Sequence, residues 1–206
     1  MTKRPEKIAG DLTQIVQGDV FADIVHRAVF SSDASIYQIT PTCVVAPKNV
    51  GDVVKVVKYA ARNGLPVVAR GAGSGLAGES LSSGIVLDIS RYMNQIINIS
   101  DDGRTVVCEP GVVLDDLNNY LAEFNRKIGP DPSSGNRAVV GGCVANNATG
   151  AHSLQYGHIS EFVECIEAVL ADGSVVEFEN NLDPDKAKNQ NAASIAKKCL
   201  NVLSDK

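Results

Sequence analysis

The sequence has few aromatic residues and no long apolar run. Tryptophan is missing, and tyrosine and phenylalanine together make up 5% of the 206 residues. No stretch comes near the roughly 20 consecutive apolar residues that a membrane-spanning helix requires. Residues 1–19 carry basic side chains without the apolar segment of a secretory signal. These absences favour a soluble protein that is not exported.

Positive charge is also scarce, and cysteine occurs in no recognisable spacing. Lysine and arginine total 19 against 24 aspartates and glutamates, so the formal net charge is −5. Such a balance gives no electrostatic support for nucleic-acid binding. The cysteines are Cys43, Cys108, Cys143, Cys165 and Cys199. Their spacing matches neither zinc nor iron–sulfur ligation, so we expect no metal site, and buried free thiols in a reducing cytoplasm.

The first half of the chain predicts helices and strands in alternation. Hydrophobic residues make up 44% of the chain, which suits one α/β domain with a sizeable core. Apolar residues at helical spacing predict one or two short helices within residues 8–29. A strand at 43–46, a helix between Asn49 and Gly64, and a strand at 66–70 follow. The short connections predict that these two strands are parallel.

The second half predicts further strands and one clear helix. Strand-like runs occupy 84–90, 94–100 and 105–111, and a turn at 101–103 joins the last two. Residues 111–125 predict an amphipathic helix. Its apolar face is expected to hold Val113, Leu117, Tyr120, Leu121 and Phe124. A hairpin is expected over 161–180, and residues 180–206 are polar and weakly helical.

A glycine-rich segment, RGAGSGLAGES at residues 70–80, follows the strand at 66–70 and contains a G-x-G-x-x-G pattern. A dinucleotide turn of the Rossmann type needs a helix directly after the glycines. Residues 79–84 are mostly serine and glycine and lead into a strand, so the Rossmann interpretation fails. Successive main-chain N–H groups in such a loop can still form a concave nest for a diphosphate. The alternative is a glycine-rich surface loop without a ligand.

A second polar segment, residues 129–157, is too long and too rich in small residues to be an ordinary connection. Hydrogen-bonding side chains lie among its glycines: Asp131, Ser133, Ser134, Asn146, Asn147, Thr149 and Ser153. Two such segments, separated by strands, favour two walls around one long ligand.

Seven motifs in order give the sequence a family resemblance. They are P-x-x-V-x-D-V from Pro47, RGAGSGLAG at 70–78, GIVLDISRYMN at 84–94, EPGVVLDDLN at 109–118, PDPSSGNRAVVGG at 130–142, NNATGAHSLQYG at 146–157 and VLADG at 169–173. Together they resemble the FAD-binding domain of the vanillyl-alcohol-oxidase or PCMH-type flavoproteins over roughly residues 30–178. The resemblance is nearest to FAD-linked D-2-hydroxyacid dehydrogenases, among them D-lactate dehydrogenase, the glycolate oxidase flavin subunit and larger relatives fused to an iron–sulfur domain. A reductase of the UDP-N-acetylmuramate type shares the fold but matches the 130–157 segment less well.

The resemblance implies an α+β fold of two α/β subdomains with FAD between them. It divides the chain into an N-terminal helical segment at 1–35, a FAD-binding domain at 36–178 with subdomains at about 36–98 and 99–178, and a polar tail at 179–206. It implies that the pyrophosphate loop contains Arg70, Gly71, Ala72, Gly73, Ser74, Gly75 and Leu76. The flavin and the rest of the cofactor would contact Pro130, Asp131, Ser133, Ser134, Gly141, Gly142, Asn146, Asn147, Thr149, Gly150, His152, Ser153, Gly157 and Val163.

Three side chains near these motifs leave alternatives open. Some family members attach FAD through a histidine in the pyrophosphate loop, and residues 70–80 contain none, so we expect non-covalent FAD. Cys143 could form a cysteinyl attachment, but its apolar setting favours a packed thiol. His152 could contact flavin or orient substrate, or be a satisfied histidine in a tight turn. Arg70 is expected to brace the loop rather than to react.

The resemblance implies hydride transfer from a D-2-hydroxy acid, such as lactate, glycolate or 2-hydroxyglutarate, to the flavin. The family's substrate-binding cap and catalytic base normally lie C-terminal to the FAD domain. We therefore expect an isolated FAD domain, truncated or encoded by a split gene, that lacks most catalytic residues. Electrons would pass to an iron–sulfur domain or another carrier, in the cytoplasm or at the inner face of the membrane through a partner. The alternative is a stand-alone FAD-binding or electron-transfer subunit, or a non-catalytic scaffold.

Overall fold

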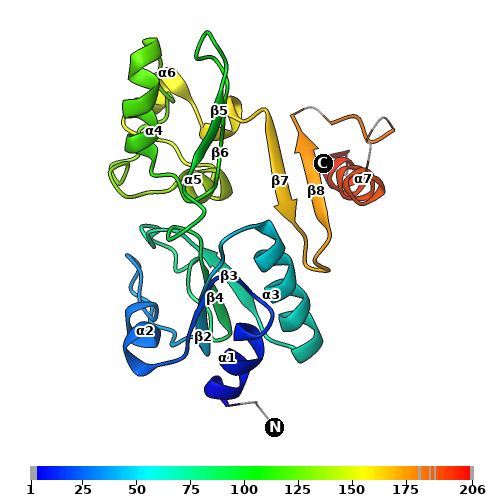
Figure 1. Ribbon diagram of the computed structural model, residues 1–206. Helices are drawn as coiled ribbons and strands as arrows, with labels where there is room; N and C mark the ends of the chain where they lie inside the picture. Colours follow the sequence, from blue (N-terminus) through cyan, green and yellow to red (C-terminus); the bar gives the residue numbers. More distant parts are fainter. Residues whose placement is uncertain (1–3, 181, 186, 188, 205–206) are drawn as a thin grey trace.

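The computed structural model describes residues 4–180, 182–185, 187 and 189–204, and it folds into two lobes with a separate hairpin beside them (Figure 1). The first lobe contains α1 (Pro5–Thr13), β1 (Asp19–Phe21), α2 (Ile24–Val29), β2 (Cys43–Ala46), α3 (Val50–Asn63), β3 (Val67–Arg70) and β4 (Ile85–Asp88). The second contains β5 (Ile96–Ile99), β6 (Val106–Cys108), α4 (Leu114–Leu121), the 3-10 helix η1 (Ala122–Phe124), α5 (Val140–Ala145), α6 (Ser153–Tyr156) and the 3-10 helix η2 (Ile159–Phe162). The hairpin is β7 (Cys165–Val169) and β8 (Val175–Glu179), and α7 (Gln190–Ser204) follows it.

The first lobe is built on a four-stranded sheet in the order β1-β2-β4-β3. Both β2 and β3 run parallel to β4, which confirms the predicted direction and places β4 between them. Asn49 caps α3 by accepting the N–H of Asp52, and Gly64 ends the helix with φ +61°, as predicted. The N-terminal residues form the two expected helices, but also β1, which pairs antiparallel with β2 and was not predicted.

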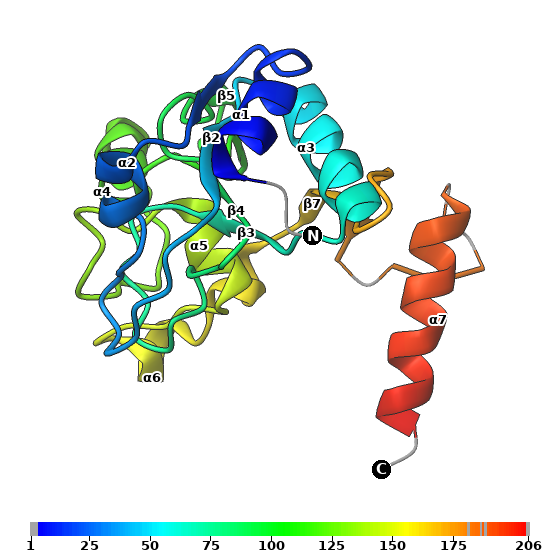
Figure 2. The same ribbon diagram turned by 90° about the horizontal axis from the view of Figure 1, so that it is seen from below.

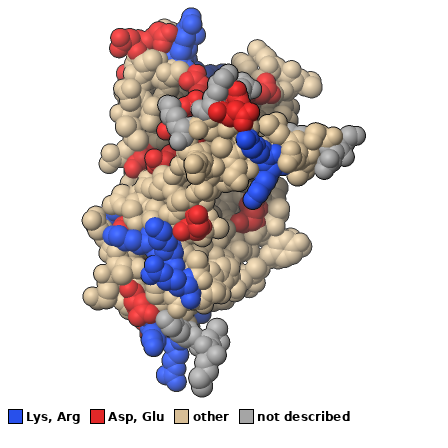
Figure 3. Space-filling view, turned by 90° about the vertical axis from the view of Figure 1, so that its right-hand side faces the viewer, with Lys and Arg blue, Asp and Glu red and all other residues tan. Residues whose placement is uncertain are grey.

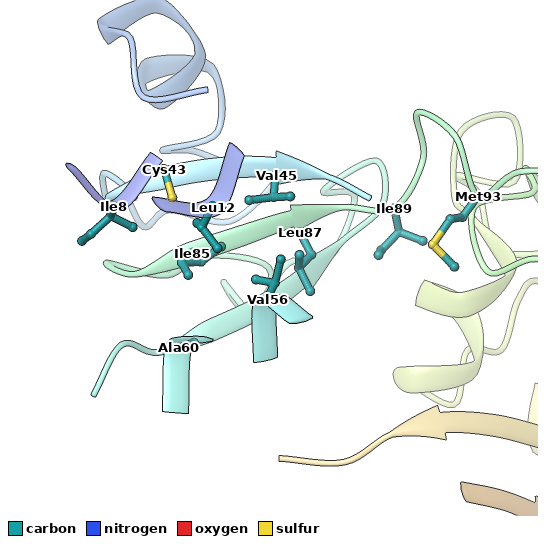
Figure 4. Close-up of a cluster of buried hydrophobic side chains, with 10 residues drawn as sticks. All are labelled: Ile8, Leu12, Cys43, Val45, Val56, Ala60, Ile85, Leu87, Ile89 and Met93. Atoms are coloured by element: carbon teal, nitrogen blue, oxygen red, sulfur yellow. The ribbon is translucent and has the colours of Figure 1, made fainter. Parts of the chain in front are cut away.

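The core of this lobe lies on one face of the sheet, under α1 and α3 (Figure 4). Cys43 and Val45 of β2 pair in register with Ile85 and Leu87 of β4. Because side chains alternate along a strand, these four point to the same face. They pack there against residues of the two helices, namely Ile8, Leu12, Val56 and Ala60. The N-terminal helix is therefore an integral part of this subdomain.

Asp52, in the first turn of α3, fastens the N-terminal segment to that core. Its side chain is 0% exposed. One carboxylate oxygen accepts the N–H of Gln17 at 2.9 Å, and the other accepts those of Gly18 at 2.9 Å and Lys48 at 3.1 Å. A buried carboxylate is tolerated when donors surround it in this way, so one side chain satisfies three main-chain groups at once.

The second lobe has small cores of its own. β5 and β6 form the predicted hairpin, and Leu117 and Leu121 of α4 pack beneath it with Val112. Tyr120 was wrongly assigned to the apolar face: it is 41% exposed, because a short helix offers the small sheet only one narrow stripe. The helix α5 lies within the glycine-rich segment and was also not predicted, and its Cys143 packs with Leu114, Ala138 and Ile159.

The β7–β8 hairpin stands apart from both small sheets and is flanked by α7, which extends away from the body of the molecule (Figure 2). Its turn follows the prediction, with Gly173 at φ +76° and the Ser174 N–H donated to Asp172. Cys165 on β7 and Cys199 on α7 are exposed, so the expectation of buried thiols is wrong for these two. The hairpin contacts α3 through β7 and α7 through β8. On the face carrying α3, the hairpin and α7, acidic and basic side chains are interspersed (Figure 3).

Candidate functional site

The glycine loop, residues 71–78, leaves the carboxyl end of β3 and returns through a turn to β4. No helix occurs in residues 71–84, which confirms that the Rossmann interpretation does not apply. Gly73 and Gly78 adopt φ values of +66° and +78°. Side chains rarely tolerate that conformation, so glycine is required for the loop to take this path.

Arg70 lies beneath the loop and braces it. A methyl group placed on Gly73 would meet the Arg70 Nη2 at 2.6 Å, so the guanidinium lies directly against the main chain. The guanidinium also lies 5.1 Å from the ring centroid of Phe30 and donates to the Phe30 carbonyl. Burial lowers the pKa of the Arg70 guanidinium, and the charges of Asp33 and Asp88 oppose that effect. A fixed cation therefore stands behind the loop.

The segment after α2 holds the loop from another side. The Ala34 N–H donates to the Gly73 carbonyl at 3.0 Å, and the Ser80 hydroxyl donates to Asp33 at 2.9 Å. No local pattern predicts this contact, because residues 31–38 are irregular and 47 positions separate Asp33 from Ser80.

The two glycine-rich segments meet in space. The side chain of Val139 lies against the Cα of Gly71, where no β-carbon could be accommodated. The Asn146 side-chain amide, at the end of α5, donates to the Glu79 carboxylate at 3.2 Å across 67 residues of sequence. The arrangement of two adjacent walls, expected from composition, is therefore present in the structure.

Asp131 joins the two ends of the second segment. Its carboxylate accepts the main-chain N–H of His152 at 3.1 Å and contacts the imidazole Nδ1 at 2.5 Å. The Cα of Gly150 lies against the Asp131 main chain, which leaves no room for a side chain there. Hydrogen bonding from the His152 side chain lowers the pKa of Asp131. The pair makes His152 part of a tight polar turn.

The other expected residues of this segment divide into two groups. Gly141, the second residue of α5, is in close contact with Pro110, and Gly142 is in ordinary contact with Val139. Ser133 and Ser134 begin the turn at 133–137 that precedes α5, and Pro130 lies just before that turn. The second group is held within the wall: the Thr149 hydroxyl donates to the Gly157 carbonyl, the Asn147 amide oxygen accepts the Ser160 N–H, and Ser153 begins α6.

Gly157 and Val163 lie behind this wall. Gly157 has φ +64° and packs against the Glu161 carboxylate, and the Val163 N–H donates to Ser160 at the end of η2. Their described contacts shape the turn that leads to β7.

A cleft of about 520 Å³ opens between the subdomains beside Ala72. That is within the usual range of about 300–1,000 Å³ for small-molecule sites. It is lined by Ala72, Ser90, Asn94, Ile96, Gly111, Val112, Val113, Asp116, Asn136, Arg137 and Val139. Most of these were not expected from sequence. They come from four separate stretches, so no local pattern could have grouped them.

Reactive thiols and metal ligands do not gather at this site in the described residues. Cys143 is buried in the apolar cluster under α5, and burial raises the pKa of its thiol. This favours the packed thiol over a flavin attachment point. Among the described residues, no group of three or more histidine, cysteine, aspartate or glutamate side chains could hold a metal ion.

Comparison with known families decides the identity of the domain. Residues 41–179 match the family model described as FAD binding domain. The chain belongs to this FAD-binding family. The resemblance drawn from the ordered motifs is thereby confirmed, as is the α+β fold. FAD is the cofactor of the family, and the same residues contain both glycine-rich segments.

Curated relatives of this FAD-binding domain include dehydrogenases and an oxidase subunit. The chain is 39% identical over 165 residues to D-2-hydroxyglutarate dehydrogenase of Escherichia coli, covering 79% of this chain and 16% of the relative. It is 32% identical over 164 residues to the glycolate oxidase subunit GlcD of Bacillus subtilis, covering 78% of this chain and 35% of the relative. The chain thus spans only a sixth to a third of the length of these relatives.

Solved structures show the same fold. An alkyldihydroxyacetonephosphate synthase superimposes with a TM-score of 0.75 at 21% identity, covering 88% of this chain and 36% of that one. No helix in the described part of the chain is long and apolar enough to cross a membrane.

The FAD-binding domain fits its cofactor on structural grounds as well. The loop requires glycine at Gly71 and Gly73, because a β-carbon there would collide with the side chains of Val139 and Arg70. Main-chain N–H groups can approach a diphosphate only where side chains are absent. Arg70 supplies a half-buried positive charge behind that main chain. The cleft beside Ala72 adds apolar and amide-bearing walls suited to a ring system.

Proposed function

We propose that this domain is the FAD-binding part of an oxidoreductase that converts a D-2-hydroxy acid to the 2-oxo acid. The observation that carries the proposal is the meeting of the two glycine-rich segments, where Val139 packs on Gly71 and Asn146 donates to Glu79. The substrate class is supported by the names of the curated relatives, a D-2-hydroxyglutarate dehydrogenase and a glycolate oxidase subunit.

In this proposal the residues of the chain hold and orient the cofactor. Main-chain N–H groups of residues 71–76 bind the diphosphate, and Arg70 keeps the loop in shape from behind. The turn fixed by Asp131 and His152, together with Pro130, Ser133, Ser134, Gly141 and Gly142, lines the flavin. Bound FAD supplies the hydride acceptor. Non-covalent attachment agrees with a loop free of histidine and with the buried Cys143.

Within this proposal His152 is the candidate to face substrate: its side chain is 61% exposed, and Asp131 fixes its ring. A carboxylate that accepts from one ring nitrogen orients the other toward a reacting group. Electron transfer onward to an iron–sulfur domain or carrier, and a cytoplasmic or membrane-peripheral setting, belong to the same proposal.

The test uses FAD-loaded protein mixed anaerobically with D-2-hydroxyglutarate, D-lactate or glycolate. The 206-residue chain alone should keep its oxidised flavin spectrum, because holding substrate against a flavin in reactive geometry accounts for about 7–11 kcal/mol of barrier and needs a second wall. In a longer protein that joins this chain to the part of the curated relatives that it does not match, one of these acids should bleach the flavin. Loss of colour with the short chain alone would show a complete active site within it. Failure of every acid with the longer protein would instead favour an electron-transfer or scaffold role.

A further inference from the structure

Glu79, just beyond the glycine loop, places a negative charge against the main chain that the proposed function assigns to a diphosphate. Its Oε2 accepts the Ala77 N–H at 3.1 Å, and its Oε1 accepts the Asn146 side-chain amide at 3.2 Å. The same oxygen lies so close to the Cα of Gly75 that no β-carbon could stand there. The carboxylate thus folds back onto the loop from its own C-terminal end.

The carboxylate is held only by neutral donors. The salt bridges of the described residues do not include Glu79, and the residue is exposed. Arg70, the cation of the loop, lies against Gly73 and is directed to Phe30, Asp33 and Asp88. Because Glu79 is exposed, water can replace both donors when the carboxylate moves. Glu79 can therefore leave the loop at small cost.

We propose that Glu79 is an affinity-determining residue of the diphosphate site, whose carboxylate competes with the cofactor's phosphates for the loop. The inference rests on the assignment of residues 71–76 to the diphosphate. Two like charges a few ångströms apart repel, and the repulsion grows where solvent is partly excluded. Binding of a diphosphate therefore requires Glu79 to swing away.

The two groups that donate hydrogen bonds to Glu79 come from different glycine-rich segments. The Ala77 N–H belongs to the first glycine-rich segment and the Asn146 amide belongs to the second. When Glu79 leaves, both become available to an anion that lies between the segments. One side chain thus couples the contact between the two walls to occupation of the site.

The test compares Glu79→Gln and Glu79→Ala with Glu123→Gln, which removes one negative charge from the exposed η1 helix. FAD binding is titrated by fluorescence, ADP serves as a diphosphate without flavin, and riboflavin serves as a flavin without phosphate. Both Glu79 variants should bind FAD and ADP about tenfold more tightly than wild type, a change equivalent to about 1.4 kcal/mol. Glu123→Gln should match wild type, and riboflavin binding should not respond to position 79.

Other outcomes overturn the inference. Unchanged or weaker FAD and ADP binding in Glu79→Gln would show that the carboxylate does not compete. Weaker binding in Glu79→Ala with wild-type binding in Glu79→Gln would make Glu79 a brace of the loop. Absence of FAD and ADP binding from all proteins would overturn the loop assignment itself. None of these results depends on whether a hydroxy acid reduces the flavin, so the proposed function is judged separately.

Amide NMR signals give a second readout. Addition of ADP to wild type should shift the Ala77 main-chain and Asn146 side-chain signals toward new positions as Glu79 leaves. In Glu79→Ala both signals should differ from wild type before ADP is added. If the Ala77 and Asn146 signals of wild type do not shift on addition of ADP, the proposed displacement of Glu79 is contradicted.

Discussion

Replacing Gly73 by valine should abolish FAD binding through the geometry of the loop. Gly73 has φ +66°, and a β-carbon there would meet the Arg70 guanidinium at 2.6–3.0 Å. A non-glycine residue held in that backbone conformation costs about 1–3 kcal/mol. The added methyl groups would also push Arg70 from beneath the main chain and crowd the surface assigned to the diphosphate.

Gly64→Val is the matched control, because it separates backbone strain from loss of the site. Gly64 has φ +61°, almost the same conformation, but a β-carbon there would have nothing within 4 Å. Both variants should therefore lose about 1–3 kcal/mol of unfolding free energy in urea titrations. Only Gly73→Val should also lose FAD affinity, by more than about tenfold, equivalent to about 1.4 kcal/mol.

The two measurements together can refute the assignment. A Gly73→Val protein that is folded and retains as much flavin as wild type would show that the diphosphate binds elsewhere. Equal loss of flavin in Gly64→Val would show that FAD binding follows global stability rather than loop geometry.

Three further predictions concern stability, attachment and pH. In urea titrations, Asp52→Ala should lower the unfolding free energy by more than about 3 kcal/mol, since three main-chain N–H groups lose a charged acceptor. The control Asp101→Ala, at an exposed turn, should change the unfolding free energy little. Acid precipitation of FAD-loaded protein should leave the flavin in the supernatant, and flavin in the pellet mapped to Cys143 or a histidine would contradict this. Because hydrogen bonding from His152 lowers the pKa of Asp131 from 3.8, its stabilisation of the 150–153 turn should be present above that pH and lost as the pH falls through the lower folded value. The Gly150 and His152 amide signals should report that loss, and an Asp131→Asn protein should show no such transition.

Several elements were readable from sequence because their boundaries are local. Asn49 and Gly64 mark the ends of α3 by side-chain capping and a left-handed conformation, so the strand–helix–strand unit follows directly. By contrast, β1 has three residues and exists because β2 offers it an edge. The six residues of α5 include two glycines, a composition that disfavours helix, and the burial of Cys143 and the close contact of Gly141 with Pro110 override it.

The residues of the candidate site likewise fall into those that the sequence predicts and those that it does not. Composition alone predicted both glycine-rich segments, because positions with a positive φ or a close main-chain contact require glycine, and glycine is visible in the sequence. No sequence pattern groups the cleft residues Asn94, Asp116 and Arg137, since each belongs to a different stretch of chain. The contact between Asn146 and Glu79 likewise depends on tertiary folding across 67 positions.

The contacts between the two subdomains determine how much a bound cofactor could add to the stability of the fold. Among the described residues, one hydrophobic cluster lies in the first lobe and two others lie in the second. Between the lobes the described contacts include main chain packed on main chain, as where Gly111 donates to the Met93 carbonyl, and the side-chain hydrogen bond from Asn146 to Glu79. Such contacts fix geometry but bury little apolar area. A ligand that contacts both walls and binds only the folded chain adds about 2.7 kcal/mol at a hundredfold excess over its Kd. If the diphosphate binds the glycine loop as proposed, we therefore expect FAD to stabilise the contact between the lobes in addition to its redox role.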